Sequence, residues 1–168
     1  MIKYIFWGVI FLFTVNILLG QEKSKSSVNI YDPNSDAMKD IKKAIKKADL
    51  ENKHVMIQVG GNWCPWCIKF HNYIKENREL DSLIQANYIF VLVNYSREQK
   101  NPEAMKFLEY PQRFGFPVLV ILDNKGKRIH TQDSGYLEQD KSYNYDRVKR
   151  FIMNWTKSAI SPENYEKD

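Results

Sequence analysis

The run Trp-Cys-Pro-Trp-Cys at positions 63–67 constrains this chain more than any other stretch. It contains the only two cysteines of the 168 residues, Cys64 and Cys67. If Cys64 caps a helix and Pro65 is the first helical residue, one turn brings Cys67 back beside Cys64. The two Cα atoms are then about 5–6 Å apart, which is within the range that a disulfide bond requires. The spacing therefore predicts a cysteine pair that opens and closes with little backbone movement.

Residues 1–20 have the layout of a secretory signal peptide. A short positive start containing Lys3 precedes an apolar run at residues 4–19, and the small residue Gly20 ends it. The run is shorter than the roughly 20 residues that span a membrane. The alternative is an uncleaved N-terminal anchor. Both interpretations export the domain, so we expect a periplasmic or secreted protein, with a membrane contact only if the segment stays attached.

Export limits the functions that an isolated cysteine pair can have. In an oxidising compartment it serves as a structural staple, a redox centre or a metal clip. A staple stabilises mainly by closing a long loop, and a ring of four residues removes little entropy from the unfolded chain. The staple is therefore the weakest of the three hypotheses.

The charge pattern does not indicate a nucleic-acid partner. The net charge is +5, but the lysines are dispersed. The densest group, at residues 39–47, has helical spacing and predicts a solvated helix face. We expect a monomer without bound nucleic acid.

Apolar patterning predicts an α/β domain over residues 28–160, followed by a flexible tail at 161–168. Buried strands are expected at 54–59, 88–93 and 118–122, with a turn at 123–126, an antiparallel return at 127–132 and a short edge strand at 28–31. Helices are expected at 36–50, 65–76, 81–86, 102–109 and 145–158, the fourth of them capped by Asn101.

These elements resemble the thioredoxin-like family over residues 36–158. Residues 55–67 are similar to its strand, loop and active-site helix, and residues 115–117 (Gly-Phe-Pro) resemble its Gly-x-cis-Pro segment. The turn at 123–126 and the final amphipathic helix complete the order. The resemblance implies a thioredoxin-like fold, a central mixed β-sheet flanked by helices. It also implies an exported thiol:disulfide oxidoreductase.

The cysteines then have distinct expected roles. Cys64, at the helix N-terminus and on the exposed side of the turn, is the nucleophile, because the helix dipole stabilises its thiolate. Cys67, one turn further on, is the buried resolving thiol that releases a mixed disulfide. No Lys, Arg or His lies inside the motif. We therefore expect the backbone and the dipole to stabilise the thiolate.

Four further residues are expected to bind the substrate. We expect Trp63 to pack beneath the active-site loop and Trp66 to be more exposed, as an apolar platform for a partner polypeptide. The backbone of Phe116, beside a cis Pro117, is expected to pair with a substrate strand.

Two positions depart from the thioredoxin pattern. Gln58 occupies the place of the buried Asp that lies six residues before the first cysteine in thioredoxins, and an apolar residue near Leu92 replaces the accompanying Lys. Gln58 forms hydrogen bonds but cannot take a proton. Proton handling of the thioredoxin kind is therefore in doubt.

Alternatives from other functional classes stay open. Cys64, Cys67 and possibly His71 could hold copper(I), which favours thiolates, although structural zinc takes four protein ligands. The chain could also be a non-catalytic binding module. For the preferred oxidoreductase we expect no metal and no cofactor besides the Cys64–Cys67 disulfide. Its partners would be protein thiols and disulfides and an unidentified redox partner, with the direction of electron flow open.

Overall fold

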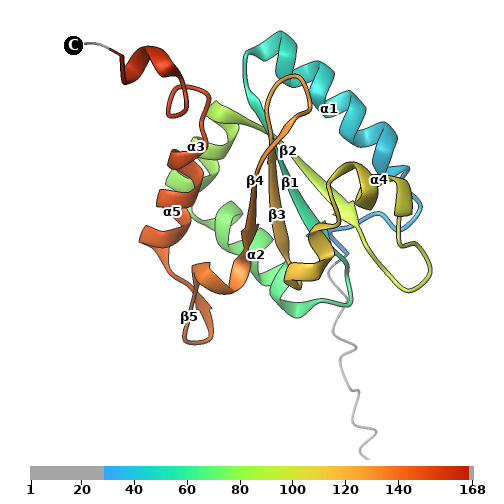
Figure 1. The fold of residues 1–168 in the computed structure, drawn as a ribbon. Helices are drawn as coiled ribbons and strands as arrows, with labels where there is room; N and C mark the ends of the chain where they lie inside the picture. Colours follow the sequence, from blue (N-terminus) through green and yellow to red (C-terminus); the bar gives the residue numbers. More distant parts are fainter. Residues whose placement is uncertain (1–28, 167–168) are drawn as a thin grey trace, which may run out of the picture.

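A four-stranded mixed sheet lies between two layers of helices in the computed structural model, which describes residues 29–166 (Figure 1). The strand order is β2-β1-β3-β4. β1 runs parallel to β2 and antiparallel to β3, and β3 runs antiparallel to β4. The strands are β1 (His54–Gly60), β2 (Tyr88–Asn94), β3 (Val118–Leu122) and β4 (Arg128–Asp133).

The helices divide between the two faces of the sheet. Side chains of α1 and α4 form one core cluster with the sheet, and side chains of α2, α3 and α5 form the other (Figure 1). The helices are α1 (Ala37–Glu51), α2 (Pro65–Glu76), α3 (Arg78–Asn87), α4 (Pro102–Phe107) and α5 (Tyr145–Asn154), with the 3-10 helices η1 (Pro111–Phe114), η2 (Ser134–Leu137) and η3 (Pro162–Asn164). The arrangement confirms the predicted thioredoxin-like α/β fold.

β1 is the central strand that its apolar run predicts. All seven of its residues are buried. Val55, Ile57 and Val59 belong to the core beneath α1 and α4, whereas Met56 belongs to the core beneath α2, α3 and α5. The alternation of side chains along a strand therefore distributes one apolar run between two cores.

The structure corrects two strand predictions. β2 lies at the edge of the sheet, and its residues 89–92 are half-buried rather than buried. Residues 29–31 form no strand, and Val28 lies outside the described residues. The Asn62 side chain explains the second difference. Its oxygen accepts from the backbone N–H groups of Ile30 and Tyr31, and its nitrogen donates to the Tyr31 carbonyl.

Local side-chain hydrogen bonds also move helix ends. α3 begins at Arg78, earlier than predicted, because the Asn77 side chain caps it by accepting from the backbone N–H groups of Glu79 and Leu80. The Asn101 side chain does not cap α4, because its nitrogen donates to the Asn94 carbonyl instead. α5 stops at Asn154 rather than at 158, and the turn that follows is held by the Thr156 hydroxyl, which accepts from the N–H of Ala159.

Some predictions concern segments at the ends of the chain. The predicted signal segment at residues 1–20 lies outside the described residues. Within residues 29–166, no helix has both the length and the apolar character needed to cross a membrane.

The short hairpin of β5 (Glu138–Gln139) and β6 (Ser142–Tyr143) was not predicted, because strands of two residues carry no periodicity.

Substitution of Phe70 tests the packing of the core beneath α2. It is fully buried, and its ring lies edge-on to Tyr143 at 5.0 Å between centroids. We expect Phe70→Ala to lower the free energy of unfolding by about 3–5 kcal/mol, because the cavity cannot close completely. Urea denaturation measures the change. The control Tyr136→Ala removes an aromatic side chain that is 74% exposed and should shift stability by less than about 0.5 kcal/mol. Equal losses in both variants would contradict the packing described here.

Candidate active site

Cys64 and Cys67 are joined by a disulfide at the N-terminus of α2. Their Cα atoms are 5.3 Å apart, within the range that the sequence spacing predicts. Cys64 is the N-cap residue, with extended backbone angles, and Pro65 is the first helical residue. The backbone N–H of Cys67 donates to Cys64 Sγ at 3.1 Å. The first turn of the helix therefore both sets the spacing of the pair and presents an N–H group to the sulfur of Cys64.

The pair is more enclosed than the sequence predicts. Cys64 was expected on the exposed side of the turn, but it is only 4% exposed, and Cys67 is completely buried. Phe116 and Trp66 pack against the cluster that contains both cysteines. Pro117 is also buried, and the Phe116–Pro117 peptide bond is cis, as expected. The little accessible surface of the pair belongs to Cys64.

The two tryptophans have exchanged their expected environments. Trp63 is 55% exposed rather than packed under the loop, whereas Trp66 is half-buried. The Trp63 indole N–H donates to the Tyr95 carbonyl at 2.7 Å, which holds its ring across the loop that follows β2. Trp66 instead packs edge-on against Tyr143, at 5.5 Å between centroids. Trp63 is therefore the aromatic surface available beside the disulfide.

Gln58 lies beneath the disulfide and is fully buried. Its side-chain nitrogen donates to the Cys67 carbonyl at 2.9 Å and to the Tyr31 hydroxyl at 2.6 Å. A carbonyl oxygen only accepts, so this contact fixes which end of the amide faces Cys67. Leu92 lies opposite Gln58 in the neighbouring strand and packs against the cysteine cluster, which confirms the predicted apolar partner.

Tyr31 is a site residue that the sequence did not reveal. A Cβ atom on Gly60 would lie 2.4 Å from Cys67 Sγ and 2.7 Å from the Tyr31 hydroxyl oxygen. Both atoms therefore lie close to the position that a side chain at residue 60 would take. Burial raises the pKa of Tyr31, so the phenol keeps its proton. Its oxygen accepts from Gln58, and its ring packs in one buried cluster with both cysteines. No motif marks Tyr31, which only the fold brings to the cysteines.

The structure does not assemble the metal site considered for His71. Over residues 29–166, no group of three His, Cys, Asp or Glu side chains is placed to hold a metal ion. His71 lies on α2 beside Phe90, with ring centroids 6.2 Å apart. Burial, helped by the positive charge of Lys75, lowers its pKa. The structure therefore places His71 on the face of α2 that packs against β2.

Comparison with known proteins agrees with this geometry. Residues 41–145 match the family of thioredoxin-like domains, which is more than half of the chain. The chain belongs to this family. A similar structure is the disulphide isomerase from Xylella fastidiosa Temecula1. It has a TM-score of 0.67 and 23% identity and covers 75% of this chain and 95% of that one. A thioredoxin from Thermus thermophilus is also similar, with a TM-score of 0.54 and 14% identity, over 76% of this chain and 92% of the other. At these identities both likenesses concern the fold.

A curated relative in sequence is the disulfide bond reductase DsbH from Chlamydia pneumoniae. It is 31% identical over 75 residues, which are 42% of this chain and 45% of the relative. The match thus spans less than half the length of that relative.

Gly60 provides a test of the close packing behind the disulfide. We expect Gly60→Ala to lower the unfolding free energy of the oxidised protein by about 1–3 kcal/mol, because the new methyl group overlaps Cys67 Sγ and the Tyr31 hydroxyl. Denaturant unfolding under oxidising conditions measures this loss. Gly135→Ala is the matched control, since a Cβ there meets only the exposed end of Asp133. A Gly60→Ala variant as stable as the control would refute the close approach.

Proposed function

We propose that the chain is an exported thiol:disulfide oxidoreductase that exchanges disulfides with protein substrates through Cys64 and Cys67. The observation that carries the proposal is the disulfide at the N-terminus of α2, with one cysteine capping the helix and the other buried a turn later. Membership of the thioredoxin-like family supports it. The relative in sequence is a disulfide bond reductase and the similar structure is a disulphide isomerase, and both point the same way.

In the reducing direction the exchange has two steps. The Cys64 thiolate, stabilised by the helix N-terminus and the N–H of Cys67, attacks one sulfur of the substrate disulfide. The other substrate sulfur leaves as a thiolate, and a mixed disulfide with Cys64 remains. The Cys67 thiolate then attacks Cys64 Sγ, releases the second substrate thiolate and restores the internal disulfide. Two electrons pass from the protein dithiol to the substrate.

The second step requires Cys67 to lose its proton in a buried position. Gln58 does not accept a proton, and Tyr31 holds its own. We therefore assign the Tyr31 hydroxyl a positioning role, in which it donates a hydrogen bond to the Cys67 thiolate. Gln58 supports that role, because it donates to the Tyr31 oxygen and leaves the phenolic proton for the sulfur. In this chain a hydrogen bond from Tyr31, held by Gln58, replaces the Asp of thioredoxins in stabilising the Cys67 thiolate, and the Cys67 proton passes to the substrate thiolate released in the first step.

Tyr31→Phe tests this arrangement. The variant keeps the ring and loses the hydroxyl, so we expect the pKa of Cys67, titrated by thiolate absorbance in a Cys64→Ser background, to rise by about 1 unit or more. Release of the mixed disulfide should slow by about 3- to 4-fold per unit near neutral pH, because the loss of thiolate is partly offset by the higher nucleophilicity of the remaining thiolate. Tyr88→Phe is the matched control, because Tyr88 is also buried but its hydroxyl donates to the Ile152 carbonyl. An unchanged pKa of Cys67 would rule out the positioning role.

The direction of electron flow is proposed to be reducing, as the name of the Chlamydia pneumoniae relative suggests. The reduction potential decides this point. We expect a value closer to the roughly −270 mV of thioredoxin than to the roughly −120 mV of a strong oxidant. Equilibration of the Cys64–Cys67 pair with a dithiol buffer of known potential measures it.

Export is proposed from the layout of residues 1–20, with a positive start, an apolar run and a small residue at its end. N-terminal sequencing of the chain recovered from its native cells distinguishes cleavage after Gly20 from a retained anchor. Recovery from the cytoplasmic fraction with Met1 still present would contradict export.

Cys67→Ser tests the exchange chemistry directly. Without the resolving thiol, the mixed disulfide with Cys64 should persist, so we expect the variant to retain substrate polypeptides that dithiothreitol releases. Cys64→Ser is the control and should retain few or none. If neither variant forms mixed disulfides, the chain is a binding module or a metal-handling protein. Stoichiometric copper(I) binding by the reduced chain would identify the latter.

A further inference from the structure

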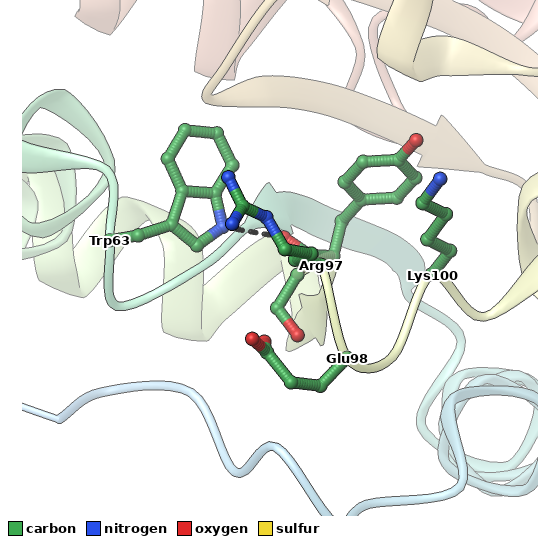
Figure 2. A pocket seen from close by; sticks show the side chains of 6 residues that line it. Trp63, Arg97, Glu98 and Lys100 are labelled. Carbon is green, nitrogen blue, oxygen red and sulfur yellow. Dashed lines mark hydrogen bonds between the residues drawn. The ribbon is translucent and has the colours of Figure 1, made fainter.

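A pocket of about 550 Å³ lies beside Trp63, the residue that precedes Cys64 (Figure 2). It lies between Trp63 and the loop that joins β2 to α4. Its lining comprises Trp63, Tyr95, Ser96, Arg97, Glu98 and Lys100. Trp63 directly precedes Cys64 in the chain, so one wall of the pocket is formed by the neighbour of the cysteine pair. None of the sequence predictions included the loop side of this pocket.

An aromatic wall connects the disulfide to the pocket. Phe116 packs against the cysteine cluster, and it also meets Trp63 edge-on, with ring centroids 5.3 Å apart. The Tyr95 ring stacks on Phe116 at 5.1 Å. The hydrogen bond from the Trp63 indole to the Tyr95 carbonyl fixes the two sides of the pocket relative to each other. A polypeptide whose cysteine engages Cys64 would therefore extend a neighbouring side chain along this wall.

Hydrogen bonds order the loop that carries the charged residues. The N–H of Tyr95 donates to the Gly60 carbonyl at 2.5 Å, which ties the start of the loop to β1. Ser96 and Gln99 close a turn, because the N–H of Ser96 donates to the Gln99 carbonyl and the N–H of Gln99 donates to the Ser96 hydroxyl. The buried Asn101 side chain donates to the Asn94 carbonyl and ties the other end. These hydrogen bonds therefore hold the loop backbone in place without a ligand.

The charges that face the pocket are predominantly positive. Within the part of the chain that the structure describes, neither Arg97 nor Lys100 forms an ion pair. Glu98 is the single acid in the lining, and hydrogen bonds from its own backbone and from Ser96 lower its pKa. In Figure 2 the Arg97 side chain reaches toward the Trp63 indole, the Glu98 carboxylate extends below it on the same side of the loop, and the Lys100 side chain lies farther from Trp63. The lining therefore carries two cations and one acid, which leaves a net positive charge for an incoming anion.

We propose that this pocket is a subsite for an acidic side chain of the polypeptide substrate, close to the cysteine that reacts with Cys64. The inference rests on the proposed oxidoreductase function and deepens it by naming a substrate class. Arg97 and Lys100 would donate charge-assisted hydrogen bonds to the carboxylate. The methylene groups of the same side chain would pack on the exposed ring of Trp63. An acidic residue thereby orients the substrate disulfide for attack.

The test uses the pre-reduced full chain and two synthetic peptides, each containing one internal disulfide. One peptide carries Glu residues on both sides of the attacked cysteine, and the other carries Gln at the same positions. In a single turnover the protein dithiol becomes the Cys64–Cys67 disulfide and the peptide disulfide becomes a dithiol, so no other reductant is needed. We expect the Glu peptide to react about 3- to 10-fold faster at low salt, and this preference to shrink as salt screens the charges.

Variants assign the preference to the pocket. The double substitution Arg97→Gln with Lys100→Gln should abolish the difference in rate between the two peptides. The control Lys42→Gln with Lys46→Gln removes the same charge from the exposed face of α1 and should retain the preference. Equal rates for both peptides in the unmodified chain, or a preference that survives the pocket substitutions, would overturn the subsite. If neither peptide is reduced at all, the result contradicts the proposed oxidoreductase function itself and not only the subsite.

Discussion

The first turn of α2 rests on the end of β1, and this contact leaves no room for a side chain at Gly60. Cys67 Sγ and the Tyr31 hydroxyl fill the space that a Cβ atom would need. Gln58, two residues earlier on the same strand, donates to the Cys67 carbonyl and joins the helix to the sheet. The position of the reactive pair therefore depends on one close approach between a strand and a helix. The depth of Cys67 and the orientation of its sulfur follow from it.

Aromatic residues from segments far apart in the sequence lie around this contact. Tyr31 comes from the stretch before α1, Tyr95 from the end of β2 and Phe116 from the turn before β3. Tyr31, Phe116 and Trp66 pack with the cysteines, and Trp63 and Tyr95 pack on Phe116 in turn. Cys64 is therefore only 4% exposed. This packing also supplies a buried environment in which one phenolic hydrogen bond counts for more than it does in water.

Much of the fold could be predicted because the patterns are local. The apolar runs of β1 and β3 and the amphipathic face of α1 depend only on neighbours along the chain, and the structure confirms them. Failures occurred where side chains from elsewhere compete for the backbone. Asn62 takes the hydrogen bonds that a strand at residues 29–31 would have needed, and Asn101 turns toward Asn94 instead of capping α4. The exposure of the tryptophans was predicted wrongly for the same reason.

Residue type and separation along the chain set the disulfide spacing, its place at the start of a helix and the loss of the thioredoxin Asp, so these features could be predicted from the sequence alone. The surroundings of the pair depend instead on the tertiary structure. Tyr31 beneath Cys67, the outward ring of Trp63 and the cations of the loop after β2 are contacts between segments far apart in sequence. Local sequence patterns do not reveal such contacts, because they arise only when the chain packs. These contacts set the environment of Cys64 and Cys67.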